Sequence, residues 1–183
     1  MKKFLFALLP LALTAVFLVQ FPARVFAGPA EEVQAAMQRL KSKAATLGTP
    51  TVNGEEAVAG KNVPALHFGA TKMNNNFVLV DEVQKEAGGT ATIFVRSGDE
   101  FVRVATNVKK NDGSRAIGSV LDPKGKAIAA IAKGESYFGE ADILGKPYVT
   151  GYEPIRDANG NIDQATQFHL SCRQYDSPAA CSQ

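Results

Sequence analysis

The sequence predicts an α+β domain: a PAS-like five-stranded antiparallel sheet with a long N-terminal helix and shorter helices packed on it. Two observations lead to this class. A long amphipathic helix pattern stands near the start, and five strand patterns follow in the second half, four of them joined in pairs by short turns. Because strands and helices do not alternate along the chain, a doubly wound parallel sheet is not expected.

The chain opens with a pattern typical of export signals. Two lysines precede an apolar stretch over residues 4–19, and small or modest residues up to Ala27 match a signal-peptidase site. We therefore predict that residues 1–27 are a cleaved signal peptide and that the protein is periplasmic or secreted. The alternative is an uncleaved N-terminal membrane anchor, but Pro10 interrupts the apolar stretch and a cleavage pattern follows it.

Two helices are predicted in the first half of the chain. Apolar residues recur at three- and four-residue steps from Glu31 to Leu47, which indicates an amphipathic helix. A second, shorter helix is predicted from Asn75 or Asn76, acting as its cap, to Ala87, where two glycines follow. The stretch 49–70 between them mixes Gly54, Gly60 and Pro64 with short apolar pairs, so we predict a loop with at most a short strand at 65–68.

Five segments rich in β-branched and aromatic residues are predicted to be strands: Thr90–Arg96, Phe101–Asn107, Ser136–Ile143, Pro147–Ile155 and Ile162–Leu170. The first two form a hairpin, and the last three follow in hairpin succession, with the final turn at Asn159-Gly160. A polar loop over 109–115, a short apolar run over 117–121 and one or two helical turns over 126–133 connect the two groups. We expect the charged side chains of the polar loop, including Arg115, to be solvated.

Composition and cysteines narrow the function classes. The chain has 20 lysines and arginines against 18 aspartates and glutamates, so no basic surface for nucleic acid is predicted. Cys172 and Cys181 are expected to form a disulfide that closes the C-terminal tail in an oxidising compartment. The chain has two histidines and none of the common motifs of hydrolases, metalloproteases or nucleotide-binding enzymes. We therefore predict no enzyme activity, no metal site and no cofactor.

Three ordered blocks carry a family resemblance: Thr90–Arg96, Phe101–Val108 and Gly145–Asp157. Over about residues 53–161 the chain resembles single Cache domains of the Cache-three/Cache-two fusion type. The resemblance implies an extracytoplasmic sensor domain of the kind found in chemoreceptors and histidine kinases, with a PAS-like sheet that holds a small ligand on one face behind a long N-terminal helix.

The resemblance also organises the chain into segments. We expect a signal peptide over 1–27, the long helix over 28–48, the Cache sensor domain over 49–170 and a tail over 171–183. Relatives run from the last strand into a transmembrane helix and a signalling module, whereas residues 163–170 are more polar here. This favours a free-standing binding protein or an accessory to a separate receptor.

One strand offers a charged ligand-binding residue. The period of two places Phe101, Arg103, Ala105 and Asn107 on one face of their strand. A guanidinium that loses water needs anionic or hydrogen-bonding partners, and its planar fork suits a carboxylate. The alternative is an arginine at an edge, in solvent or paired with an internal glutamate. The Cache resemblance favours a place in the pocket.

A later strand offers hydroxyl and ammonium donors. Lys146, Tyr148, Thr150 and Tyr152 alternate along it, and Tyr137 lies on the neighbouring strand. Core packing is the alternative for the tyrosines, and it is favoured more for Tyr152 than for Tyr148. We predict a ligand site in which Arg103 and Lys146 supply charge while Tyr148, Tyr137 and Asn107 supply hydrogen bonds.

The leading hypothesis is thus an exported module that binds a small metabolite such as a short carboxylate. The competing hypothesis is a structural or interaction protein that keeps the Cache scaffold without a ligand. A membrane receptor or kinase, or a second copy of the chain docked through the N-terminal helix, are the protein partners that these hypotheses imply.

Overall fold

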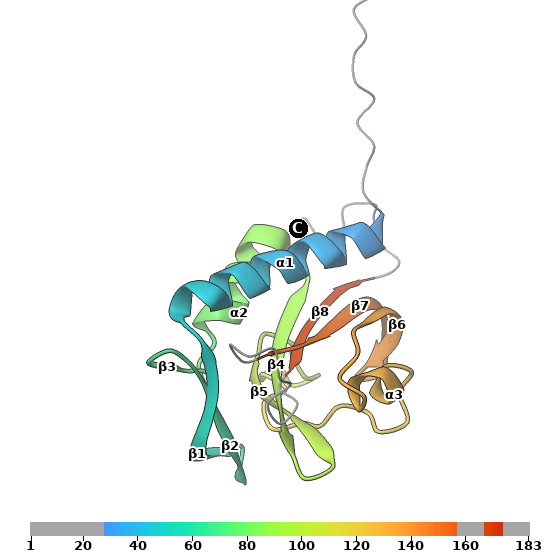
Figure 1. Cartoon of the computed structure of the whole chain (residues 1–183). Helices are drawn as coiled ribbons and strands as arrows, with labels where there is room; N and C mark the ends of the chain where they lie inside the picture. The colour runs from blue at the N-terminus through green and yellow to red at the C-terminus, as the bar shows by residue number, and fades with distance from the viewer. Residues whose placement is uncertain (1–27, 157–166, 174–183) are drawn as a thin grey trace, which may run out of the picture.

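The computed structural model describes residues 28–156 and 167–173, which form two sheets and three helices (Figure 1). The predicted signal peptide, the final Asn-Gly turn and the Cys172–Cys181 disulfide fall outside what it describes.

The two predicted helices are confirmed, with one shift. α1 runs over Pro29–Leu47, and α2 over Val78–Ala87. α2 begins after the predicted caps because Asn75 has a φ of 59°, and Asn76 instead accepts a hydrogen bond from the Val78 N–H through its side chain at 3.1 Å. A third helix, α3, covers only Ile128–Ile131, within the predicted helical turns.

The predicted loop over 49–70 is wrong. β1 (Pro50–Val58) and β2 (Lys61–Phe68) form an antiparallel hairpin, and the short β3 (Thr71–Lys72) adds a third strand. The glycines shape this hairpin instead of breaking it, because Gly54 lies where the register shifts in a bulge and Gly60, with a φ of 83°, lies in the turn.

The predicted five-stranded antiparallel sheet is confirmed: it consists of β4 (Thr90–Ser97), β5 (Glu100–Thr106), β6 (Tyr137–Ile143), β7 (Lys146–Pro154) and β8 (Gln167–Arg173). Its spatial order is β5-β4-β8-β7-β6, so the first and last strands in sequence lie side by side at the centre. β8 continues through residues 171–173, which the prediction gave to the tail, because these residues pair with residues 148–150 of β7.

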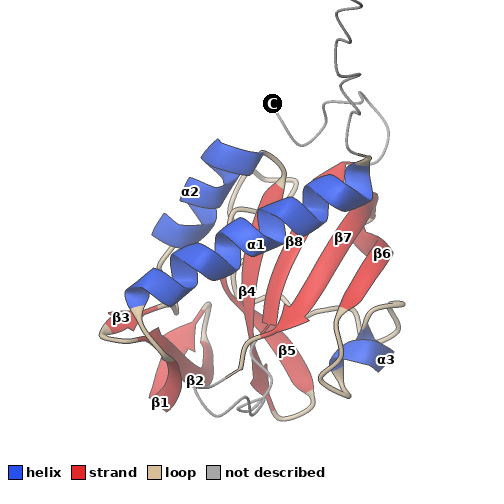
Figure 2. Cartoon of the chain, turned by 45° about the horizontal axis from the view of Figure 1, so that its top comes forward, coloured by secondary structure: helices blue, strands red, loops and turns tan. Residues whose placement is uncertain are grey.

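The two faces of this sheet have different covers. α1 crosses β4, β8 and β7 on one face (Figure 2), where Met37 and Leu40 pack in one apolar core with Ile93 and Phe168. We call this the helix face. α3 lies on the opposite face with Ile131 in a second apolar cluster beside sheet residues. We call that the α3 face.

The hairpin of β1 and β2 is joined tightly to α1. Gly69 has a φ of 55°, and a Cβ atom there would lie 2.3 Å from the carbonyl oxygen of Leu47. Only glycine therefore allows the end of β2 to pass the C-terminus of α1 at this distance.

Candidate ligand-binding site

Arg103 is a buried charge on the α3 face. Its side chain is 3% exposed, with the guanidinium carbon 4.9 Å from the centre of the Phe94 ring. Nη1 donates to Ser119 Oγ at 2.8 Å, while Nε has no hydrogen-bond partner among the described residues. Burial lowers the pKa of Arg103, but a guanidinium keeps its proton in proteins. No described carboxylate pairs with this buried cation, so it has no counterion among the described residues.

His169 lies close to this charge. It is fully buried in β8, stacked on Tyr152 with ring centroids 4.3 Å apart and edge-on to Phe94 at 6.1 Å. Neither ring nitrogen has a hydrogen-bond partner among the described residues. Burial, and then the charge of Arg103, lowers the pKa of His169 well below its ordinary value of 6.5. The ring is therefore neutral near pH 7 and carries an N–H that no described group accepts, at a cost of about 1–3 kcal/mol.

Neighbouring hydroxyls on the same face are satisfied, in contrast to Arg103 and His169. Thr92 and Thr106 share a hydrogen bond at 2.7 Å, and Thr150 donates to the carbonyl of Gly139 at 2.9 Å. Unpartnered buried polar atoms are rare in folded proteins and point to a missing ligand, ion or water. Among the described residues they are confined to Arg103 and His169.

A cavity of about 310 Å³ opens on this face between α3, the segment before it and the strands β6 and β7. Its inner wall is largely apolar, and exposed charged residues stand at its mouth: Asp122, Lys124, Lys126, Glu140 and Asp142. Tyr152 both lines the cavity and stacks on His169, so a single ring separates the cavity from the buried imidazole. The volume suits a small molecule.

The loop that carries Ser119 is held by an ion pair, so the prediction that Arg115 is solvated is wrong. Both terminal nitrogens of Arg115 donate to the carboxylate of Asp81 in α2 at 2.8 Å, and Nη1 also donates to the carbonyl of Thr106. In the next part of the loop the Arg103 N–H donates to the Ser119 carbonyl, and the Gly118 N–H donates to the Arg103 carbonyl. Asp81 thereby fixes the segment that supplies a hydrogen-bond partner to the buried guanidinium.

The predicted site residues divide into two groups. Arg103, Tyr137 and Tyr148 lie on the α3 face, where the Tyr137 ring is 6.2 Å from that of Tyr152 and burial raises the pKa of Tyr137. Tyr148 is half-buried in a small cluster beside the loop. Lys146 is exposed at the start of β7. Asn107 uses its amide within the fold, accepting from the Ala91 N–H and donating to the Val80 carbonyl, both at 2.8 Å.

The prediction that Arg103, Ala105 and Asn107 share a face is wrong. The register between β4 and β5 shifts from Ile93 opposite Ala105 to Phe94 opposite Arg103, so Val104 is an extra residue in a bulge. Alternation reverses there: Arg103 faces Phe94, whereas Ala105 packs in the core under α1 and Asn107 bonds to α2.

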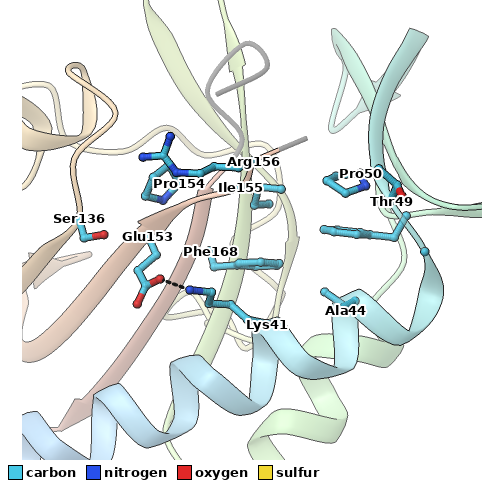
Figure 3. A pocket seen from close by; sticks show the side chains of 13 residues that line it. Lys41, Ala44, Thr49, Pro50, Ser136, Glu153, Pro154, Ile155, Arg156 and Phe168 are labelled. Atoms are coloured by element: carbon cyan, nitrogen blue, oxygen red, sulfur yellow. Dashed lines mark hydrogen bonds and ion pairs between the residues drawn. The ribbon is translucent and has the colours of Figure 1, made fainter. Parts of the chain in front are cut away.

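A second cavity, of about 500 Å³, lies on the helix face between the end of α1, the start of β1 and the end of β7 (Figure 3). Phe68 and Phe168 stack in its wall with centroids 5.9 Å apart. Its charged groups bond within the protein, because Lys41 pairs with Glu153 at 2.5 Å and Arg156 donates to the carbonyl of Gly134. Among its described residues this cavity therefore has no counterpart to the unpartnered Arg103 Nε and His169 ring nitrogens.

The arrangement of a long helix on one face and a buried polar site on the other agrees with one family. The chain matches the Cache 3/Cache 2 fusion domain over residues 28–162. The protein belongs to this family. No curated protein matches the chain significantly. Cache domains are extracytoplasmic sensor domains that bind small molecules. Within the described part of this Cache domain, no helix is long and apolar enough to cross a bilayer.

Two residues of the site were not among those predicted from the sequence. Tyr152 was assigned mainly to core packing, and His169 received no role. A signal for His169 was present, since a histidine between Phe168 and Leu170 in a central strand of this Cache domain must face away from an apolar core. Arg103 could be predicted from the sequence of its own strand, whereas the burial of His169 depends on the pairing of β8 with β4 and β7.

Proposed function

We propose that the protein is an exported Cache sensor protein that binds a short carboxylate on the α3 face. The observation that supports this proposal best is the buried guanidinium of Arg103. It has no described counterion and lies in one cluster with Phe94, Tyr152 and His169. An anion would supply the missing charge, and the guanidinium fork fits a carboxylate. The cavity next to Tyr152 supplies room for the rest of a small ligand. We expect a membrane receptor or kinase to recognise the bound form.

A thermal-shift experiment tests this function. Acetate, propionate, pyruvate and succinate are compared with chloride at equal ionic strength and with the neutral amides acetamide and propionamide. At least one carboxylate is expected to stabilise the protein, by about 2.7 kcal/mol at a concentration of a hundred times its Kd. The amides are expected to have no effect, because they bring no charge to Arg103.

Two arginine variants make the test specific. Arg103→Met keeps the apolar stem over Phe94 and removes the charge, so we expect it to fold and to lose the stabilisation by carboxylate. Arg96→Met is the matched control, since Arg96 lies at the exposed end of the neighbouring β4. If no carboxylate stabilises the parent protein, or if Arg103→Met responds as the parent does, the proposal fails and an accessory protein without a ligand is favoured.

A further inference from the structure

The surroundings of His169 suggest that ligand binding is linked to a proton. The imidazole is fully buried and has no hydrogen-bond partner among the described residues, although it lies in a cluster with a cation and a tyrosine. A neutral imidazole can serve as donor or acceptor, while the imidazolium form donates from both nitrogens. Without a ligand, the site thus contains a neutral imidazole. If this ring gained a proton, it would become a second cation that attracts an incoming anion.

Two effects disfavour the protonated form of His169 when no ligand is bound. Transfer of a charge out of water is unfavourable, and the nearby guanidinium of Arg103 repels a second positive charge. An anion beside Arg103 removes the repulsion and adds an attraction, and both changes favour the protonated ring. We propose that a carboxylate binding at Arg103 and Tyr152 draws one proton from solvent onto His169. This inference rests on the proposed function.

The other ionisable groups around His169 do not titrate in the same range. Arg103 on β5 stays charged, and Tyr152 on β7 and Tyr137 on β6 stay protonated because burial raises the pKa of both hydroxyls. β4 places Phe94 and Thr92 against the ring. The charged residues at the cavity mouth are exposed carboxylates and lysines. Between about pH 5.5 and about pH 7.5, His169 is the group in this cluster that can respond.

The coupling has a measurable size. An opposite charge within about 4–6 Å moves a pKa by about one to three pH units, so the bound anion is expected to raise the pKa of His169 by that amount. Uptake of one proton on binding lowers the apparent Kd by up to about tenfold for each pH unit of acidification. The protein would then bind its carboxylate more tightly in mildly acidic surroundings.

The experiment combines two readouts on the whole protein. Ring ¹H–¹⁵N NMR spectra follow both histidines of the chain between about pH 5.5 and about pH 7.5, with and without the probe carboxylate that stabilises most among acetate, propionate, pyruvate and succinate. His67, half-buried on β2, is the internal control. We expect the ring of His169 to become protonated only with the carboxylate, while the ring signals of His67 are the same with and without it.

Kd is measured over the same pH range for the parent and for His169→Gln, which keeps a polar side chain but does not titrate. We expect the pH dependence of Kd to disappear in His169→Gln. If the dependence persists in this variant, or if His169 stays neutral with the carboxylate bound, the proton coupling is overturned while the proposed function stands. If none of the four carboxylates binds the parent at any pH, both are overturned. Should the variant not fold, the NMR titration of the parent decides the matter by itself.

Discussion

Mild acid is expected to destabilise the ligand-free protein through His169. In the folded state burial and Arg103 hold the pKa of this ring well below 6.5, whereas in the unfolded chain it titrates near 6.5. Between the folded and the unfolded pKa the unfolded state therefore binds one proton more than the folded state. Stability rises with pH in that window and is lost as the pH falls below about 6.5.

The size of the effect follows from the same linkage. Above about pH 7 the ring is neutral in both states and contributes no pH dependence. At about pH 5 protonation stabilises the unfolded chain by up to about 2 kcal/mol more than the folded state, in which the pKa of the ring is lowered. For a domain of this size, this corresponds to a decrease of roughly 4–8 °C in Tm.

Urea denaturation at a series of pH values measures this directly. We compare the parent with His169→Phe, which keeps a ring stacked on Tyr152 but cannot titrate, and with His67→Gln as a control for the other histidine. Glu56 and Asp112 lose their contributions only at lower pH, because a hydrogen bond from Lys72 and one from Ser114 lower the pKa of these carboxyls from 4.5 and 3.8. The reasoning is refuted if His169→Phe shows the same loss of stability between about pH 7 and about pH 5 as the parent.

Two further predictions concern how the site is held in place. Gly69→Ala is expected to lower the unfolding free energy by at least about 2 kcal/mol more than Gly54→Ala does. Both positions have positive φ, but only at Gly69 would the added methyl meet the Leu47 carbonyl. Equal losses in urea denaturation would contradict the packing argument. A double-mutant cycle on Asp81 and Arg115, which are joined by two hydrogen bonds, is expected to give a coupling of about 1 kcal/mol. The exposed pair Lys61–Glu100 is expected to give less than about 0.5 kcal/mol, and a coupling of the same size there would show that the partly buried, two-bond geometry of Asp81 and Arg115 adds nothing.

The helices and the five strands of the larger sheet could be predicted from the sequence because each depends on local periodicity, whereas the family was identified by the resemblance of three sequence blocks. Apolar spacing predicted α1, alternating β-branched segments predicted the five-stranded sheet, and an arginine in an apolar strand indicated the centre of the proposed site. These features depend on neighbours within a few residues, and the structure confirms the fold they predict.

Tertiary structure decided the rest because the deciding partners are distant in the chain. The bulge at Val104 turned Asn107 away from Arg103, and it exists only in the pairing of β5 with β4. Arg115 pairs with Asp81 in α2, a contact that a loop's polarity does not predict. His169 acquires its burial and its neighbours only when the last strand inserts between β4 and β7. Charge and periodicity can be read from short stretches of the sequence, whereas burial and ion pairing depend on the assembled sheet.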